Sequence, residues 1–142
     1  MKREVKRKRR EYVLSALIAW LVMVVLAGCN YSESEKVRDL DALIISEEAL
    51  PKELAEIIST KKEEPFQFTF SDQENLYICI GYGKQETGGY DIVLNDLYLT
   101  ETEVIVDTTL LGPDGGKQEK KTATCPFIVI RTERTEQPVV FR

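Results

Sequence analysis

The sequence contains no histidine, and this absence excludes several kinds of chemistry. Without an imidazole there is no Ser–His or Cys–His nucleophile pair, no His-ligated zinc and no imidazole proton switch. Cysteine is also scarce, with 3 residues among 142. The 43% apolar fraction, in contrast, is ordinary for a globular chain and argues against wholesale disorder. The length allows one domain plus a short extra segment, and not two full domains.

Charge is unevenly distributed along the chain. The first 28 residues carry seven basic and two acidic side chains, whereas residues 29–142 carry 12 basic and 22 acidic ones, a net charge of −10. A domain with this charge is repelled by phosphate backbones and by anionic lipid headgroups. We therefore expect no nucleic-acid binding. If the domain lies near a membrane, something other than surface charge must hold it there.

The N-terminus has the pattern of a secretory signal. A basic stretch precedes a 15-residue apolar run from Tyr12 to Leu26, and small residues follow the run. The run is shorter than the about 20 residues that a membrane-spanning helix needs, and an uncleaved signal anchor is the alternative interpretation. The basic cluster favours a cytoplasmic start of the chain, which places the rest outside the cytoplasm.

The residues after the apolar run are more specific. Leu26, Ala27, Gly28 and Cys29 resemble the bacterial lipoprotein cleavage box, or lipobox. There a diacylglycerol is attached to the cysteine, which becomes the first residue after cleavage. Two acyl chains hold a protein at a membrane far more firmly than one. We therefore predict a signal peptide at 1–28, lipidation of Cys29 and a lipid-anchored location at the extracytoplasmic face of a bacterial cell membrane.

Residues 38–142 are predicted to form one small domain, joined to Cys29 by a polar tether within 29–37. The short apolar stretch at 40–45 predicts a first strand. One helix is predicted at about 51–63, because apolar residues recur there at helical spacing and a proline stands near each boundary.

The rest of the domain has the composition and the alternation of β structure. Predicted strands, separated by turns or loops, cover 66–70, 76–82, 90–99, 103–111, 127–130 and 139–141. Sequential strands with short turns favour antiparallel pairing. We expect an α+β domain that is mainly β: an antiparallel sheet or sandwich of about six to seven strands, with one helix inserted after the first strand.

Two cysteines remain once Cys29 is assigned to the anchor. Cys79 and Cys125 both lie in apolar, strand-like runs. The outside of a membrane permits a disulfide between them, but a spacing of 46 residues defines no framework, and buried free thiols explain the same positions. Both interpretations stay open. We predict no metal site.

A glycine-rich segment, Gly81 to Tyr90, joins two predicted strands. Its four glycines indicate tight turns or the close approach of a partner to the backbone. It is neither a P-loop nor a dinucleotide-binding fingerprint, because no helix follows it. Its tyrosines suit protein recognition, whereas the alternative is a hairpin whose glycines serve backbone geometry alone. The candidate partner-binding residues are Tyr82, Gly83, Thr87, Gly88, Gly89 and Tyr90.

The same segment carries a family resemblance. Together with Leu111-Gly-Pro113 and Cys125-Pro-Phe-Ile-Val-Ile130, it resembles the PrcB C-terminal domain family, over roughly residues 38–142. The family name comes from a subunit of a surface protease complex. The resemblance implies a non-catalytic lipoprotein that binds a protein, as a subunit or stabiliser of such a complex. One departure is Cys125, where an aromatic residue is expected before the proline.

Two other functions stay open. The stretch Thr87-Gly-Gly-Tyr90 is similar to the Thr-Gly-Tyr loop of chagasin-type cysteine-protease inhibitors, which are immunoglobulin-like β-sandwiches, and this implies an inhibitor acting through the loop. An enzyme with a carboxylate pair is the third function, but the acids stand in no recognisable motif and resemble a solvated face. We predict a protein-binding module that is not an enzyme and needs no cofactor.

Overall fold

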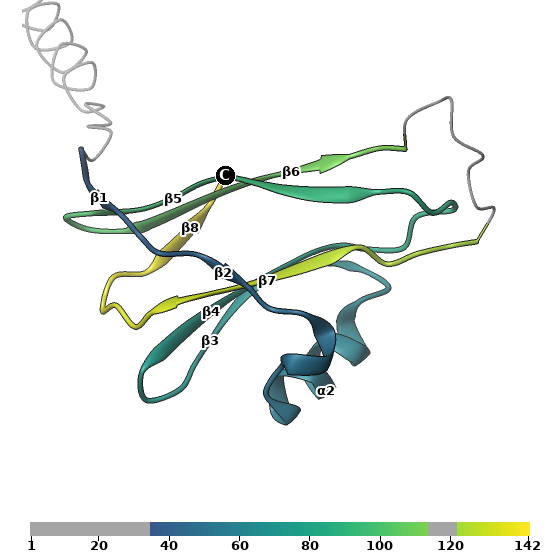
Figure 1. Ribbon diagram of the computed structural model, residues 1–142, viewed down its shortest axis with the longest axis horizontal. Helices are drawn as coiled ribbons and strands as arrows, with labels where there is room; N and C mark the ends of the chain where they lie inside the picture. Colours follow the sequence, from purple (N-terminus) through teal and green to yellow (C-terminus); the bar gives the residue numbers. More distant parts are fainter. Residues whose placement is uncertain (1–34, 114–121) are drawn as a thin grey trace, which may run out of the picture. The chain divides into compact units, whose positions relative to one another are not determined.

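Two four-stranded β-sheets make up most of the domain (Figure 1). The computed structural model describes residues 35–113 and 122–142. The predicted signal peptide at 1–28, the lipobox and Cys29 lie outside these residues. Sheet A consists, in spatial order, of β1 (Lys36–Asp39), β5 (Asp91–Thr100), β6 (Val104–Leu111) and β8 (Val139–Phe141). Sheet B consists of β2 (Leu43–Ile44), β7 (Phe127–Glu133), β4 (Asn75–Tyr82) and β3 (Pro65–Ser71).

The predicted fold class is confirmed: the domain is mainly β, and one α-helix, α2 (Lys52–Lys61), follows the first strands. A short 3₁₀ turn, η1 (Glu47–Ala49), precedes this helix. Strand pairing is antiparallel throughout the described residues except between β6 and β8, which run parallel. The chain turns back between β7 and β8 by changing sheets, so β8 joins the edge of sheet A instead of pairing with its predecessor.

The strands before the helix differ from the sequence prediction. Within the predicted strand at 40–45 only Leu43–Ile44 form a strand, β2, and a strand that was not predicted, β1, lies before it and begins at Lys36, within the stretch that we interpreted as a tether. Leu40 lies between them, where the chain crosses from sheet A to sheet B. Its side chain is buried in the core, and its backbone N–H donates to the carbonyl oxygen of Leu97 at 3.1 Å. The described residues therefore contain eight strands, where the sequence predicted six to seven.

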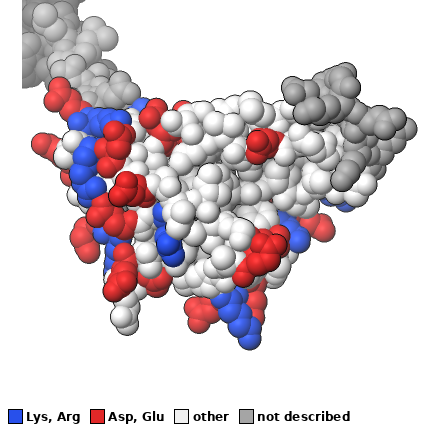
Figure 2. All heavy atoms as spheres, in the orientation of Figure 1, with Lys and Arg blue, Asp and Glu red and all other residues white. Residues whose placement is uncertain are grey.

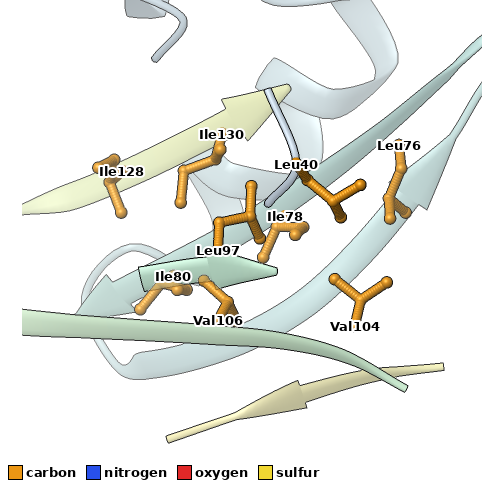
Figure 3. Close-up of a cluster of buried hydrophobic side chains, with 9 residues drawn as sticks. All are labelled: Leu40, Leu76, Ile78, Ile80, Leu97, Val104, Val106, Ile128 and Ile130. Atoms are coloured by element: carbon orange, nitrogen blue, oxygen red, sulfur yellow. The ribbon is translucent and has the colours of Figure 1, made fainter. Parts of the chain in front are cut away.

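The main hydrophobic core lies between the two sheets (Figure 3). It contains Leu40, Leu76, Ile78, Ile80, Leu97, Val104, Val106, Ile128 and Ile130. Figure 3 shows these side chains converging from strands of both sheets. Burial of this apolar surface supplies the main favourable free energy for packing one sheet on the other.

The outer face of sheet B is covered by α2. Leu54 and Ile58 of this helix are almost fully buried and form a second cluster with Tyr77, Cys79 and Val129 of the sheet. The central strands of sheet B, β4 and β7, are therefore buried on both faces, which explains why β4 is apolar at nearly every position instead of alternating. The predicted helix is confirmed, and its boundaries are slightly tighter than 51–63.

A β-bulge in β5 changes which residues face the core. The pairing of β5 with β6 shifts between Leu94 and Asp96, so that Asn95 is an extra residue. Before the bulge Ile92 and Leu94 pack against the core, and after it Leu97 does so. Because side chains alternate between faces with a period of two, the bulge allows apolar residues at even and then odd positions to reach one core.

The turn between β3 and β4 is held by the carboxylate of Asp72. Its Oδ1 accepts hydrogen bonds from the backbone N–H of Glu74 at 2.9 Å and of Asn75 at 2.7 Å, and its Oδ2 accepts one from the Tyr77 hydroxyl at 3.1 Å. These hydrogen bonds lower the pKa of Asp72 from 3.8 to about 2, and the two from backbone N–H groups have the largest effect.

This low pKa predicts a pH dependence of stability. A carboxyl with a depressed folded-state pKa stabilises the domain above its unfolded pKa, and the contribution is lost as pH falls from about 3.8 to about 2. The Asp72→Asn variant carries no carboxylate at any pH, so it lacks this pH-dependent contribution. We expect the melting temperature of the wild type to exceed that of the variant near neutral pH, and the gap to close at the acidic end. Thermal melts by circular dichroism across this range test it; a gap that stays constant would contradict it.

Candidate functional site

The glycine-rich segment connects the two sheets. It leaves β4 in sheet B at Tyr82 and enters β5 in sheet A at Asp91. These two strands belong to different sheets and do not pair, so the segment is a crossing between layers and not a hairpin. The crossing explains why the chain needs several special turns here, since it must change direction and layer within a few residues.

Backbone hydrogen bonds fix the middle of this loop. Gln85 and Thr124 exchange two bonds, N–H to O at 2.7 Å and 3.0 Å, and the Thr124 hydroxyl donates to the carbonyl oxygen of Thr87 at 2.9 Å. The Lys84 N–H donates to the carbonyl oxygen of Glu63, after α2, at 3.0 Å. The loop is thus tied both to the segment before β7 and to the end of the helix.

Tyr82 has a structural role in this arrangement. Its hydroxyl donates to the carbonyl oxygen of Thr108 in β6 at 3.1 Å and lies 2.9 Å from the Thr108 hydroxyl. Its ring packs against the main core. Tyr82 therefore links sheet B to sheet A, and its hydrogen-bonding group is already used inside the domain.

Gly83 is required by the backbone conformation. Its φ is +71°, in the left-handed region that favours glycine, and a Cβ there would lie 2.9 Å from the backbone nitrogen of Pro65. For this residue the structure supports the interpretation in which the glycine serves geometry.

The other candidate residues lie at the second half of the loop. Gly88 is buried, Gly89 is exposed, and Thr87 and Tyr90 are half-buried. A Cβ on Gly89 would lie 3.1 Å from the Cβ of Pro113, so this end of the loop lies beside the end of β6. The structure therefore brings Thr87 to Tyr90 together at one end of the sandwich, whereas Tyr82 and Gly83 belong to its interior.

Sequence reasoning missed Thr124 and Thr108, which hold the loop in place. Both make their contacts through single hydroxyl groups, 37 residues from Thr87 and 26 residues from Tyr82 respectively. A lone threonine at such a separation gives no sequence signal. The one hint is the position of Thr124 immediately before the Cys125-Pro126 pair of the family motif.

Cys79 and Cys125 are both free thiols, which decides between the two interpretations of the sequence. Cys79 is fully buried under α2, and this burial raises the pKa of its thiol to about 12. Cys125 is half-buried. A thiolate is the reactive form of cysteine, so the two should differ in reactivity.

Alkylation should distinguish these thiols. With the folded chain in mildly alkaline buffer, we expect iodoacetamide to modify Cys125 and to leave Cys79 unmodified until denaturant is added, because Cys79 is neither accessible nor ionised. Mass spectrometry of proteolytic peptides assigns the modified sites. Equal modification of both residues in the folded chain would contradict the buried position of Cys79.

Two further observations concern residues 35–113 and 122–142 only. No three His, Cys, Asp or Glu side chains there gather closely enough to hold a metal ion. Among the same residues, neither length nor hydropathy makes any helix a candidate membrane span.

Comparison with known families gives a match over the central part of the domain. The sequence model of the PrcB C-terminal family matches residues 76–133. The predicted resemblance to the PrcB C-terminal domain family is confirmed over this stretch, which is shorter than 38–142. The match runs from β4 to the end of β7 and includes the loop with its partner Thr124. Comparison with curated proteins and with solved structures gave no match.

Proposed function

We propose that the chain is a membrane-anchored, extracytoplasmic lipoprotein whose domain is a non-catalytic protein-binding module, and that it serves as a subunit or stabiliser of a surface protease complex. The observation that carries this proposal is the PrcB C-terminal match at residues 76–133. The matched stretch contains the loop 81–90 and the strands on either side of it.

The geometry of the loop supports a binding role. Its backbone is fixed by Thr124 and by the end of α2, while Lys84, Glu86 and Gly89 remain exposed. A surface that is ordered before binding loses less conformational entropy on association than a flexible one. The loop can therefore present Thr87 to Tyr90 to a partner in a fixed conformation.

Charge indicates the kind of partner. The described residues contain 19 acidic and 9 basic side chains. Figure 2 shows that acidic side chains occupy more of the visible face than basic ones do, with large uncharged areas between them. A field of this sign accelerates association with a positively charged protein surface and disfavours an acidic one.

Capture from membranes tests the binding role. The full chain is purified from detergent-solubilised membranes, and bound proteins are identified by mass spectrometry. We expect a protease to be captured by the wild type and lost from a Thr87→Ala/Tyr90→Ala double variant. A Tyr98→Ala/Thr109→Ala variant, which removes the same side-chain types from sheet A, is the matched control and should capture it. Failure of the wild type to capture any protease would contradict the proposal.

The anchor has its own test. We expect Cys29→Ser to abolish labelling by a palmitate analogue and to release the chain from the membrane fraction, because the thiol is the site of acylation. Labelling and cell fractionation of the wild type and the variant measure both effects. A Cys29→Ser chain that is still labelled would show that the lipid is attached elsewhere or that the lipobox assignment is wrong.

The fixed conformation of Thr87 also favours a second function, inhibition of a cysteine protease through Thr87 to Tyr90. The Thr124 hydroxyl holds the Thr87 carbonyl at the start of this stretch, as an inserting loop would require. A papain-type protease assayed with the full chain separates the two functions. Inhibition at micromolar concentration that disappears in the Thr87→Ala/Tyr90→Ala variant would favour the inhibitor.

A further inference from the structure

The four edge strands of the two sheets differ in how they are shielded. β1 carries Lys36, Arg38 and Asp39 and has a register shift, while β2 and β8 are only two and three residues long. β3 is different: it has seven residues, pairs with β4 without a bulge, and carries no charged side chain. Proteins usually shield sheet edges with charges, bulges or short strands, because an open edge pairs with other chains. β3 has none of these devices, and a single proline, Pro65, stands at its first residue.

The backbone groups that β3 presents outward follow from its register. The Asp72 N–H donates to the carbonyl oxygen of Asn75 at 3.1 Å, so these two residues form a hydrogen-bonded pair next to the turn. Bonded and non-bonded pairs alternate along an antiparallel ladder. The β3 residues that form hydrogen-bonded pairs with β4 are therefore Phe70, Phe68 and Phe66. The residues whose N–H and C=O point away from the sheet are Gln67, Thr69 and Ser71.

These outward-pointing residues are also the accessible ones. Gln67, Thr69 and Ser71 are exposed, whereas the three phenylalanines are half-buried against α2. Within the described part of the chain, no hydrogen bond to the outward backbone groups is present. An added strand would therefore find both donors and acceptors along β3.

Two hollows lie at the start of the same edge, one toward each face of sheet B. The first, of about 500 Å³, lies beside the end of α2 and is lined by residues 59–61 and 63–66. The second, of about 240 Å³, is lined by residues 65–67 and 80–82. Its side chains from Ile80 and Tyr82 belong to the face that looks toward sheet A, since both pack on the main core. Successive side chains of a strand point to opposite faces, so two neighbouring residues of an added strand would enter the two hollows.

Charge favours a partner protein over a second copy of this chain at the edge. Two domains that each carry 19 acidic and 9 basic side chains in their described parts repel one another. The charged lining of the larger hollow is Lys61, Glu63 and Glu64, which leaves one negative charge in excess. A Lys or Arg side chain suits this hollow. The smaller hollow, lined by Ile80 and Tyr82, suits an apolar side chain.

We propose that the free edge of β3 is a strand-addition site for an extended segment of a partner protein, which places a basic side chain beside Glu63 and Glu64 and the next, apolar side chain over Ile80. Main-chain hydrogen bonds to Gln67, Thr69 and Ser71 supply affinity, and the two hollows supply specificity. Further apolar side chains of the segment pack beside Phe68 and Phe70. This inference rests on the proposed function as a protein-binding module, and it names a second contact surface, in addition to Thr87 to Tyr90, and the chemistry of the segment bound there.

Substitution of Thr69 separates the backbone from the side chain. Proline at this position removes an outward N–H and leaves the hydrogen bonds between β3 and β4 intact, because proline is tolerated on the open side of an edge strand. Valine retains the N–H and is the matched control. We therefore expect Thr69→Pro to fold but to lose strand addition, and Thr69→Val to retain it.

The probe is a blocked peptide as long as β3, with the sequence Lys-Leu-Val-Thr-Val-Thr-Val, used with its reversed sequence because the direction of pairing is open. Amide hydrogen exchange of the full chain in detergent micelles is the measurement. We expect the peptide to slow exchange at Gln67 and Ser71 by about tenfold or more in the wild type and in Thr69→Val. Affinity should fall by about tenfold or more in Thr69→Pro.

Other outcomes overturn the inference. Equal protection in Thr69→Pro would place the peptide elsewhere, and equal protection by a peptide with Glu in place of Lys would contradict the charge assignment. Protection that rises with protein concentration without peptide, together with a dimer in sedimentation, would make a second copy the occupant. Capture of the protease by Thr69→Pro as well as by the wild type would refute the β3 site but not the binding module. No capture by the wild type would refute the binding module itself.

Discussion

Replacing Ile78 by Ala is expected to lower the free energy of unfolding by about 2–5 kcal/mol. Ile78 belongs to β4, and its side chain is fully buried in the main core. It lies opposite Ile130 of β7. The substitution removes apolar surface from the core and leaves a cavity, because the two sheets are held in place by many other contacts and can close only partly around it. Urea unfolding followed by circular dichroism measures the change.

Ile44 provides a matched control for this substitution. It also lies opposite Ile130, in the edge strand β2, but 59% of it is exposed. The same Ile→Ala change there is expected to alter stability by about 0.5 kcal/mol or less, as surface substitutions usually do. Similar losses at the two positions would mean that the core does not lie between the sheets as described.

Replacing Gly83 by Ala is expected to destabilise the domain by about 1–3 kcal/mol, the usual range for a residue forced into a rare backbone conformation. With φ at +71°, an L-residue is strained whatever the surrounding space, and here the added Cβ would also meet the backbone nitrogen of Pro65 at 2.9 Å. Backbone atoms cannot move aside as the end of a flexible side chain can. Denaturant unfolding of the variant measures the effect.

Gly112→Ala is the control for Gly83→Ala. Gly112 has no positive φ, and its nearest neighbour to an added Cβ is Cε1 of Tyr90 at 3.9 Å, an ordinary contact. We expect a change of about 0.5 kcal/mol or less there. If Gly83→Ala were equally neutral, the structural role of Gly83 would be refuted, and its place in the glycine loop would again require a binding explanation.

Most of the secondary structure could be predicted because the sequence patterns are strong there. Phe66, Phe68 and Phe70 alternate with polar residues and form β3, as expected. The helical spacing of Leu54 and Ile58 correctly predicts α2, and these two residues are the ones that the sheet buries. Local patterning and proline positions suffice when a segment has one buried face.

The elements that were not predicted lack such a local pattern. β1 consists of Lys36, Val37, Arg38 and Asp39, which alternate in no useful way and form a strand only because β5 offers a partner. The bulge at Asn95 is set by the pairing of β5 with β6 and has no turn residue to mark it. Pairing is a property of two segments, so one segment cannot reveal it.

The candidate site divides in the same way. The glycines between residues 81 and 90 correctly indicated unusual turns, since Gly83 and Gly89 have positive φ. The sequence could not show that the Tyr82 hydroxyl is hydrogen-bonded to Thr108, nor that the Thr124 hydroxyl is hydrogen-bonded to Thr87. Both contacts join segments far apart along the chain. Only after these contacts are known do Thr87 to Tyr90 separate from the structural half of the loop.

The sequence by itself determined the class of the domain and its family resemblance, because alternation, helical spacing and glycine content act within a few residues. The state of Cys79 and Cys125, the order of the strands and the unshielded edge at β3 were decided by the tertiary structure. Each of these depends on which segments meet in space. Burial, and with it the pKa of Cys79 and the exposure of Thr69, exists only after the two sheets and α2 have packed together.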